Sequence, residues 1–208
     1  MRNGRYFSAK SILKFGIQAI QRIRALHELG YVHSDIKPEN FLIGDTDPNC
    51  IYLIDFGLSR QFINTTTGEF RSPYQPKYRG TAAYCSLFVN MGYEHARRDD
   101  LISLGHTMIS ILERNQLPWF GTLRDYLRLV RESDSIENRS RPLHKIAAAA
   151  QKATSIEELC HRMPMMQRFF EYLYGLNYED RPEYEYLEGI LSDGLASFEA
   201  DLSNNLIT

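Results

Sequence analysis

Apolar residues recur every three or four positions near the start of the chain and predict an amphipathic helix. Ser8 is placed to cap its first turn, and Gly30 is placed to stop it. The apolar positions are Ile12, Phe15, Ala19, Ile23 and Leu26, widened by Leu13, Ile17 and Ile20.

Two short β-like runs follow this helix and predict a small hairpin. The runs are Phe41–Ile43 and Tyr52–Ile54, and the residues between them include the turn formers glycine, aspartate, proline and asparagine. From Gly57 to Tyr84, glycine, proline and hydroxyl residues interrupt every periodicity. A loop of this length in a compact domain usually has a function.

The second half of the chain is dominated by helical patterns. The segment Leu101–Leu112 is apolar nearly all round, which predicts a helix buried in the middle of the fold. Further helices are expected around residues 121–132, 143–153, 165–175 and 183–191. With 208 residues, the chain is long enough for one domain, and its expected fold class is mainly α with a small β-hairpin.

Composition and charge exclude several classes of function. A net charge of −2 from 24 basic and 26 acidic residues gives no electrostatic signature for nucleic acid or anionic lipid. Three cysteines without a CxxC pair argue against a disulfide framework or a zinc ribbon and indicate a reducing, intracellular setting, cytoplasmic or nuclear or both. No apolar run approaches the roughly 18 residues of a membrane span, so we expect neither a signal peptide nor a transmembrane helix. The histidines lack HxxxH or HExxH spacing, so no transition-metal site is expected.

Polar residues of defined type cluster on two loops between these predicted elements. His33–Asn40 reads HSDIKPEN and lies where the first helix ends and the hairpin begins. Asp55–Gly57 reads DFG and directly follows the second strand of the hairpin. A lone aspartate near a helix end is most often a cap or a turn residue, and DFG alone would be a weak signal. Seven specified residue types in this order make coincidence negligible.

These residue types suit the transfer of a phosphoryl group. That reaction needs a carboxylate to orient the attacking hydroxyl and oxygen ligands to hold magnesium against the phosphates. Asp35 fits the first role, whereas Asn40 and Asp55 fit the second. Lys37, two residues after Asp35, is placed to neutralise the transferring phosphate.

H-x-D-x-K-x-x-N followed by D-F-G is the pattern of the catalytic and metal loops of protein kinases, and the chain resembles that superfamily. The motifs GTxxYCS from Gly80, RRDDL from Arg97 and LPW from Leu117 make it similar to the casein kinase I group. The run from Arg60 to Thr66, with Tyr78–Thr81, resembles the tau-tubulin-kinase-like branch most closely. The resemblance extends from about residue 4 to residue 191.

The resemblance implies the C-terminal, large lobe of a protein kinase over residues 1–195, followed by a tail at 196–208. Its implied cofactors are ATP and Mg²⁺, with Asn40 and Asp55 as metal ligands and Gly57 as a further cofactor-binding residue. Thr81 would hydrogen-bond near Asp35 and Lys37 and complete the catalytic set. We expect a monomer that acts on a protein substrate and binds neither nucleic acid nor membrane.

The resemblance also assigns two supporting residues and one missing part. Asp100 would anchor the backbone of the catalytic loop, and His33 is expected to have a structural role. A kinase small lobe needs at least ~40 residues in its strands and helix, and only seven precede Ser8. We therefore expect the small lobe to be absent, which would leave apolar side chains of the hairpin exposed, namely Leu42, Ile43, Leu53 and Ile54.

The chain departs from the kinase pattern at three positions. Ser34 replaces the arginine of the H-R-D motif that pairs with a phosphate on the activation loop in many kinases, so loop phosphorylation is not expected to raise activity. Ala83 replaces an arginine of the anion pocket for pre-phosphorylated substrates, which puts that preference in doubt. Arg181 has lost its usual glutamate partner, because Ser86-Leu87-Phe88 replaces Ala-Pro-Glu.

Three functions remain open on the sequence. The first is a serine/threonine protein kinase domain, the second is a non-catalytic kinase-like binding module, and the third is a small-molecule phosphotransferase that shares H-x-D-x-x-x-x-N. The DFG sequence, the Gly80-Thr81 turn and Lys37 disfavour the third. A two-carboxylate glycosidase is discarded, because it would leave Lys37 and Asn40 without a role.

Overall fold

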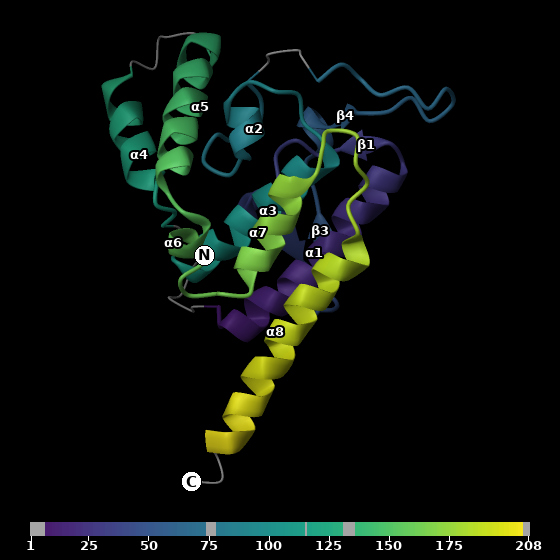
Figure 1. Ribbon diagram of the computed structural model, residues 1–208, viewed down its shortest axis with the longest axis vertical. Helices are drawn as coiled ribbons and strands as arrows, with labels where there is room; N and C mark the ends of the chain where they lie inside the picture. The colour runs from purple at the N-terminus through teal and green to yellow at the C-terminus, as the bar shows by residue number, and fades with distance from the viewer. Residues whose placement is uncertain (1–6, 74–77, 115, 131–135, 206–208) are drawn as a thin grey trace.

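The computed structural model describes residues 7–73, 78–114, 116–130 and 136–205, and these residues form a mainly helical fold (Figure 1). This confirms the predicted fold class. The longer helices are α1 (Ala9–Glu28), α3 (Arg97–Leu112), α4 (Phe120–Leu129), α5 (Ile136–Ala153), α7 (Met166–Gly175) and α8 (Tyr184–Asn205), and the shorter ones are α2 (Leu87–Asn90) and α6 (Ile156–Leu159). In Figure 1, α4 and α5 lie side by side on one flank, and α1, α3, α7 and α8 form the body.

Helix α1 begins and ends where its sequence predicts. The hydroxyl oxygen of Ser8 accepts a hydrogen bond from the backbone N–H of Ser11 at 3.1 Å, which satisfies an N–H group that the first turn leaves unpaired. The helix stops two residues before Gly30, which has a φ of +83°. Glycine adopts this left-handed conformation without steric cost, so the chain can reverse direction there.

Two small antiparallel sheets hold the loops that carry the polar motifs. Strand β2 (Phe41–Ile43) pairs with β3 (Ile51–Leu53), so the predicted hairpin is confirmed with its second strand one residue earlier. Strand β1 (Tyr31–Val32) pairs with β4 (Arg60–Gln61), and this pair was not predicted. Strands of two residues show no periodicity, and their pairing depends on contacts that are distant in sequence.

Two helices are longer than their sequence patterns indicate. Helix α5 begins at Ile136 rather than near residue 143 and contains Pro142. Proline favours helix ends because it lacks the backbone N–H, and this preference makes the true start hard to predict. Helix α8 continues through residues 196–205, the segment expected as a tail, so the domain boundary at residue 195 stays a prediction.

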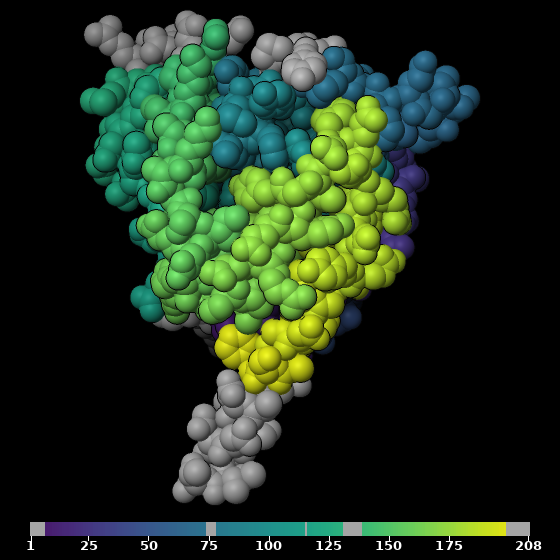
Figure 2. All heavy atoms as spheres, in the orientation of Figure 1, coloured from purple at the N-terminus to yellow at the C-terminus, as the bar shows by residue number. Residues whose placement is uncertain are grey.

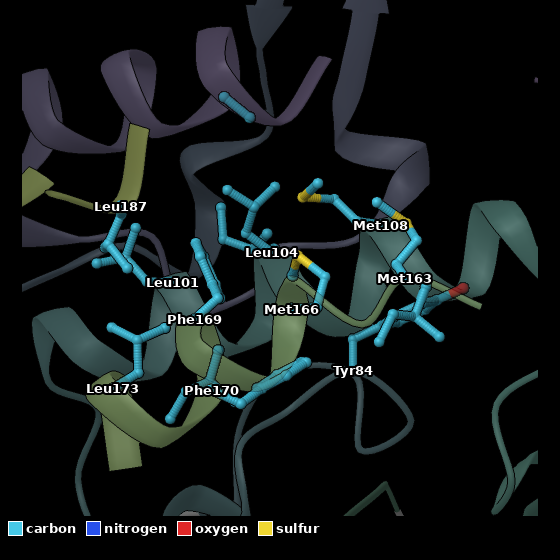
Figure 3. Packing of buried hydrophobic residues seen from close by; sticks show 14 of the residues in the cluster. Tyr84, Leu101, Leu104, Met108, Met163, Met166, Phe169, Phe170, Leu173 and Leu187 are labelled. Carbon is cyan, nitrogen blue, oxygen red and sulfur yellow. The ribbon is translucent and has the colours of Figure 1, made fainter. Parts of the chain in front are cut away.

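The core lies where α3 crosses α1 and α7, and Figure 3 shows its side chains interdigitating. Helix α3 is buried on nearly every side, as its uniformly apolar sequence predicts. Each fully buried large apolar side chain contributes about 1.5–3 kcal/mol to folding. Those labelled in Figure 3 include Leu101, Leu104 and Met108 from α3, Phe169, Phe170 and Leu173 from α7, and Leu187 from α8.

A glycine in α3 is required by this packing. A Cβ atom at Gly105 would lie 2.6 Å from the ring of Phe170, which is fully buried and cannot move aside. Nothing lies within 4 Å of a Cβ atom at Gly189 in α8. We therefore expect Gly105→Ala to destabilise the fold by about 1–2 kcal/mol, because overpacking outweighs the gain in helix propensity.

Gly189→Ala is the matched control for this prediction and should stabilise the protein by about 0.5–1 kcal/mol. Urea unfolding of both variants measures the difference. Equal stabilisation by the two alanines would show that α3 and α7 do not pack as closely as described.

Candidate active site

The loop with the sequence HSDIKPEN is held by one buried carboxylate from α3. Asp100 accepts hydrogen bonds from the backbone N–H groups of His33 at 2.6 Å and Ser34 at 2.9 Å. The ring of His27 also contacts this carboxylate, with its Nε2 atom 3.0 Å from Asp100 Oδ2. Burial raises the pKa of Asp100, but the hydrogen bond with His27 and the neighbouring imidazoles outweigh it and leave the pKa below its usual range. The expected anchoring contact of Asp100 is confirmed.

The anchored backbone approaches a second loop very closely. Ser34 has a φ of +69°, a conformation that is uncommon for a residue other than glycine. Gly80 also has a positive φ, of +79°, and a Cβ atom there would lie 2.4 Å from the carbonyl oxygen of Ser34. Only glycine fits at this contact, so Gly80 allows the next residue, Thr81, to reach the first loop.

Asp35, Lys37 and Thr81 meet in one hydrogen-bonded cluster. Lys37 Nζ donates to Asp35 Oδ2 at 2.6 Å and to Thr81 Oγ1 at 3.2 Å. The N–H and the hydroxyl of Thr81 both donate to Asp35 Oδ1 at 2.8 Å. The contact expected between Thr81 and the other two residues is therefore present.

The electrostatics of this cluster keep Asp35 ionised. Burial raises the pKa of Asp35, because its side chain is only 8% exposed, but the hydrogen bonds from Lys37 and Thr81 outweigh burial and lower the pKa below its usual range. A carboxylate in this state is an acceptor only. It can therefore accept and orient a hydroxyl group at neutral pH.

Asn40 is buried beside Asp35 on a 3₁₀ turn at Pro38–Asn40. Its amide nitrogen donates to the carbonyl oxygen of Asp35 at 2.8 Å and lies 3.5 Å from Asp35 Oδ2. Because the amide nitrogen faces Asp35, the amide oxygen of Asn40 is left as a possible ligand atom.

Asp55 lies on the adjoining loop with its side chain exposed. Its backbone is left-handed, with φ of 63° and ψ of 69°, and its carboxylate caps the 3₁₀ turn Phe56–Leu58 by accepting from Gly57 N at 3.4 Å. Aspartate adopts this conformation more readily than most residues, because its short side chain bonds locally. A Cβ atom at Gly57 would lie 3.2 Å from that carboxylate, which favours glycine there.

The neighbours of Asp55 join it to the first loop. Ile54 donates its N–H to the carbonyl oxygen of Asn40 at 2.9 Å, and its own carbonyl lies 3.0 Å from His33 Nε2. The ring of Phe56 packs edge-on against His33, with the centroids 5.4 Å apart. Asp55 is therefore held between two residues that contact the loop with the sequence HSDIKPEN. The structural role expected for His33 agrees with these contacts.

The donor set fits magnesium better than a transition metal. Within the residues that the structure describes, no group of three or more histidine, cysteine, aspartate or glutamate side chains could hold an ion. Magnesium is commonly held by one or two protein carboxylates, water and substrate phosphates. The amide oxygen of Asn40 and the carboxylate of Asp55 are ligand atoms of the types that magnesium takes.

Several apolar side chains of the hairpin and of the loop after Asp55 are exposed. Leu42 is 51% exposed, Ile43 60% and Phe56 51%, which agrees with the expectation for the first two. Leu53 and Ile54 were also expected to be exposed but are half-buried. For Leu53 the reason is that it packs against the core. The expectation of a missing small lobe concerns the start of the chain, where residues 1–6 lie outside the described residues.

The loop that contains Thr81 is clamped by side chains that sequence reasoning missed. Trp119 Nε1 donates to the carbonyl of Ala83 at 2.7 Å, and His106 Nδ1 lies 2.9 Å from the carbonyl of Tyr84. These partners are 36 and 22 residues apart in sequence, so no local pattern signals the contacts. Trp119 belongs to the LPW motif, which was noted only for its resemblance.

Arg181 has a partner that the sequence did not reveal. Its guanidinium lies 3.7 Å from the carboxylate of Glu28 and 5.4 Å from the ring centroid of Tyr184. Both charged side chains are about half exposed, so the ion pair contributes little to stability.

Buried histidines make the stability of this site depend on pH. Burial lowers the pKa of His106 to about 4 and that of His144 to about 4, from an ordinary 6.5. Between pH ~4 and ~6.5 the unfolded chain binds more protons than the folded chain. The free energy of unfolding is therefore at its full value above pH ~6.5 and decreases as the pH falls towards ~4. Each histidine accounts for a loss on the order of 3 kcal/mol in the free energy of unfolding over this pH range.

Urea unfolding at several pH values tests this prediction. His106→Gln keeps a donor for the carbonyl of Tyr84 and should flatten the dependence between pH ~4 and ~6.5. The same substitution at the exposed His161 should leave the slope unchanged. A slope unaffected by His106→Gln would contradict the assignment.

The chain is similar to known protein kinases. Residues 1–187 match the family model described as protein kinase domain. A probable serine/threonine-protein kinase of Dictyostelium discoideum is 38% identical over 190 residues, which cover 90% of this chain and 34% of the relative. A probable casein kinase I homolog of Encephalitozoon cuniculi is 38% identical over 197 residues, which cover 92% and 59%. Casein kinase I homolog 2 of Schizosaccharomyces pombe is 34% identical over 198 residues, which cover 92% and 42%.

These matches cover about nine tenths of the chain but only part of each relative. The chain spans between about a third and three fifths of the length of these curated relatives. Among the described residues, no helix has both the length and the apolar character needed to cross a membrane. The chain therefore belongs to the protein kinase family, with a fold like that of the kinase C-terminal lobe, and is homologous to the casein kinase I enzymes.

Proposed function

We propose that the chain is a serine/threonine protein kinase domain that transfers the γ-phosphate of ATP to hydroxyl groups of protein substrates. The observation that carries the proposal is the cluster of Asp35, Lys37 and Thr81, in which an ionised carboxylate is held by three hydrogen bonds of 2.6–2.8 Å. Little covalent chemistry is needed from the protein in this reaction, because positioning and charge stabilisation account for most of the catalysis.

Each residue of the cluster has a distinct task in this proposal. Asp35 accepts the hydrogen bond of the attacking hydroxyl and directs its oxygen towards the phosphate. Lys37 neutralises negative charge on the transferring group, and Thr81 holds the carboxylate in place. Because Thr81 lies on the loop after Gly80, it also couples the position of the substrate-facing loop to that of Asp35.

Asn40, Asp55 and Gly57 are proposed to hold the cofactor. Asn40 and Asp55 would ligate Mg²⁺, which supplies charge neutralisation at the nucleotide phosphates when it is bound. Gly57 keeps the turn that aims the carboxylate of Asp55 outwards. The exposed apolar side chains of Leu42 on the hairpin and Phe56 after Asp55 support the proposal, since a nucleotide base needs an apolar neighbour.

Finer assignments rest on sequence similarity. The run from Arg60 to Thr66 supports placement near the tau-tubulin-kinase-like branch of the casein kinase I group. Ala83 supports a substrate preference that does not depend on prior phosphorylation, and Ser34 supports activity without loop phosphorylation. We propose an intracellular monomer that acts on proteins.

A non-catalytic binding module is the second candidate. It is favoured by one observation, namely that the exposed apolar side chains of Leu42, Ile43 and Phe56 could contact a partner protein as well as a nucleotide. A small-molecule phosphotransferase is disfavoured by the DFG sequence, the Gly80-Thr81 turn and Lys37.

Replacement of the proposed base tests the catalytic assignment. In a form of the protein that includes a small lobe, with Mg–ATP and a serine-containing protein substrate, we expect Asp35→Asn to lower the transfer rate by at least about 100-fold, because the amide cannot take the place of the ionised acceptor. Transfer of radioactive phosphate measures the rate. Asp193→Asn, at an exposed position of α8, is the control. Wild-type transfer by Asp35→Asn would refute the assignment.

Nucleotide-dependent stability separates the two candidates. At about 100 times its dissociation constant, Mg–ATP should stabilise the kinase by about 2.7 kcal/mol, which corresponds to a rise of about 5–10 °C in the unfolding temperature. Asp55→Asn should lose most of this rise, and chelation of magnesium should abolish it.

Asp47→Asn in the exposed turn of the hairpin is the matched control and should retain the full rise. A wild-type protein that Mg–ATP does not stabilise would favour the binding module. Full stabilisation of Asp55→Asn would remove Asp55 from the metal site.

A further inference from the structure

A pocket of about 350 Å³ lies where the end of α1, the hairpin of residues 63–70 and the turn before α8 meet. Its described lining includes two cations, one acid and three further polar side chains, namely Arg97, Arg181, Glu28, His27, Tyr184 and Thr65. We name it the Arg97–Arg181 pocket. Figure 2 shows the blue surface of the 63–70 hairpin beside the yellow-green surface of the turn before α8.

Arg97 is held in place by its neighbours but keeps unused donors. Its guanidinium lies 4.7 Å from the ring centroid of Phe62 and 5.8 Å from that of Phe70. Its Nη2 donates to the carbonyl oxygen of Glu179 at 2.6 Å, whereas its Nε has no hydrogen-bond partner among the described residues. A guanidinium carries five N–H donors in a rigid, planar fork. The terminal nitrogens of Arg97 can therefore still donate to a ligand.

Arg181 faces the same pocket with a weakly held charge. Its described carboxylate contact is with Glu28 at 3.7 Å, and both side chains are about half exposed. Glu28 lies closer to Arg24, at 2.8 Å. The glutamate of the Ala-Pro-Glu motif, the usual partner of this arginine in protein kinases, is replaced in this sequence. The guanidinium of Arg181 is therefore available to a stronger anion.

The two arginines leave the pocket with an excess of positive charge. Burial lowers the pKa of Arg97, and the charge of Arg181 acts in the same direction, so the two guanidinium groups repel each other. Glu28 is the one acid among the described lining residues. Asp180 attracts Arg97 less strongly than Arg181 repels it, and Asn177 donates two hydrogen bonds to the carboxylate of Asp180. A bound anion would relieve this repulsion.

An exposed hydroxyl residue of the 63–70 hairpin adjoins these arginines. Thr65 is exposed and lines the pocket. A Cβ atom at Gly30 would lie 2.7 Å from Thr65 Cγ2, so the side chain of Thr65 packs against the turn that ends α1. Thr66 is also exposed but is not among the described lining residues. A phosphate group on residue 65 would therefore start at the pocket, whereas one on residue 66 would not.

We propose that the Arg97–Arg181 pocket binds a phosphate group, shared between the two guanidinium groups. Arginine binds phosphate through paired N–H···O bonds, and these are among the stronger hydrogen bonds in proteins. A phosphate monoester carries a charge of about −1.5 to −2 at neutral pH and has three acceptor oxygens, so it can pair with both arginines at once. A polyanion such as RNA would need further cations along its path.

This site goes beyond the proposed phosphoryl transfer, because none of the proposed catalytic or metal-binding residues is among its described lining residues. The pocket nevertheless adjoins the anchor of the HSDIKPEN loop. The hydroxyl of Tyr184 lies 2.8 Å from His27 Nδ1, and the same ring contacts Asp100 through Nε2. A phosphate in the pocket would therefore lie beside that anchor without contacting Asp35.

Titration of the full chain with inorganic phosphate tests the proposal. At about pH 7.5 and constant ionic strength, we expect isothermal titration calorimetry to show saturable binding. At about ten times the dissociation constant, the unfolding temperature should rise by about 3–6 °C. Arg181→Gln should weaken binding about tenfold or more, because it removes one of the two guanidinium groups. Saturation separates binding from the general stabilisation of proteins by phosphate salts.

Replacement of the neighbouring acid should act in the opposite direction. Glu28→Gln removes the carboxylate that competes for Arg181, so it should tighten phosphate binding about threefold. Misfolding cannot produce tighter binding. Arg168→Gln, exposed on α7 and absent from the described lining, is the matched control for Arg181→Gln and should leave binding unchanged. Circular dichroism of each variant checks the fold.

Two phosphorylated forms of the full chain identify the source of the phosphate. Phosphothreonine is incorporated during translation at position 65 in one form and at position 66 in the other. If residue 65 supplies the phosphate, the first form unfolds at a higher temperature and no longer binds added phosphate, and Arg181→Gln cancels the rise. If a separate molecule supplies it, the first form binds added phosphate as the unmodified chain does. The form phosphorylated at position 66 should bind added phosphate in either case.

Three outcomes would overturn the proposal. One is the absence of saturable binding at phosphate concentrations up to about 50 mM. Another is equal affinity of the wild type and Arg181→Gln. The third is binding that Lys37→Gln weakens and Arg181→Gln does not, which would place the phosphate at the catalytic cluster. None of these measurements requires phosphoryl transfer, so a failed kinase assignment would not affect the result.

Discussion

The buried carboxylate of Asp100 is the interaction on which the site depends. It accepts hydrogen bonds from two backbone N–H groups that lie 66 and 67 residues earlier in the chain. It therefore joins the first turn of the central helix to a loop far away in sequence. The loop cannot satisfy those N–H groups by itself, because Ser34 is left-handed and makes no regular secondary structure. A charged acceptor gives hydrogen bonds about twice as strong as a neutral one, which suits a loop that must not move.

Two adjacent carboxylates at the start of α3 act in different directions. Asp100 holds the catalytic loop, whereas Asp99 accepts from Ser86 Oγ at 2.5 Å and from Ala96 N at 2.7 Å. Burial raises the pKa of Asp99 above its usual range despite nearby His95, while the partners of Asp100 lower its pKa. The two aspartates therefore differ in how readily their carboxyl groups ionise, because their neighbours differ. Through this pair, one helix positions both the HSDIKPEN loop and the start of α2 at Ser86.

A strand pair and a nearly buried ion pair fix the segment after the DFG motif. Strand β4 pairs with β1 just before the catalytic loop, and Arg60 in that strand meets the nearly buried Glu94. A buried ion pair is tolerated only while both partners are present, because an unpaired buried charge is strongly destabilising. These two contacts hold the segment after the DFG motif against the start of the HSDIKPEN loop.

The sequence by itself determined the features that are encoded locally. The spacing of apolar residues in α1 and α3, the turn between β2 and β3 and the order of residues in HSDIKPEN and DFG each involve neighbours along the chain, so periodicity and motif spacing reveal them. Similarity to kinases added Thr81 and Asp100. Tertiary structure alone decided the pairing of β1 with β4, the hydrogen bond of Trp119 to Ala83 and the pairing of Arg181 with Glu28. Each depends on which helices pack together, and packing joins residues whose separation along the chain leaves no repeating pattern.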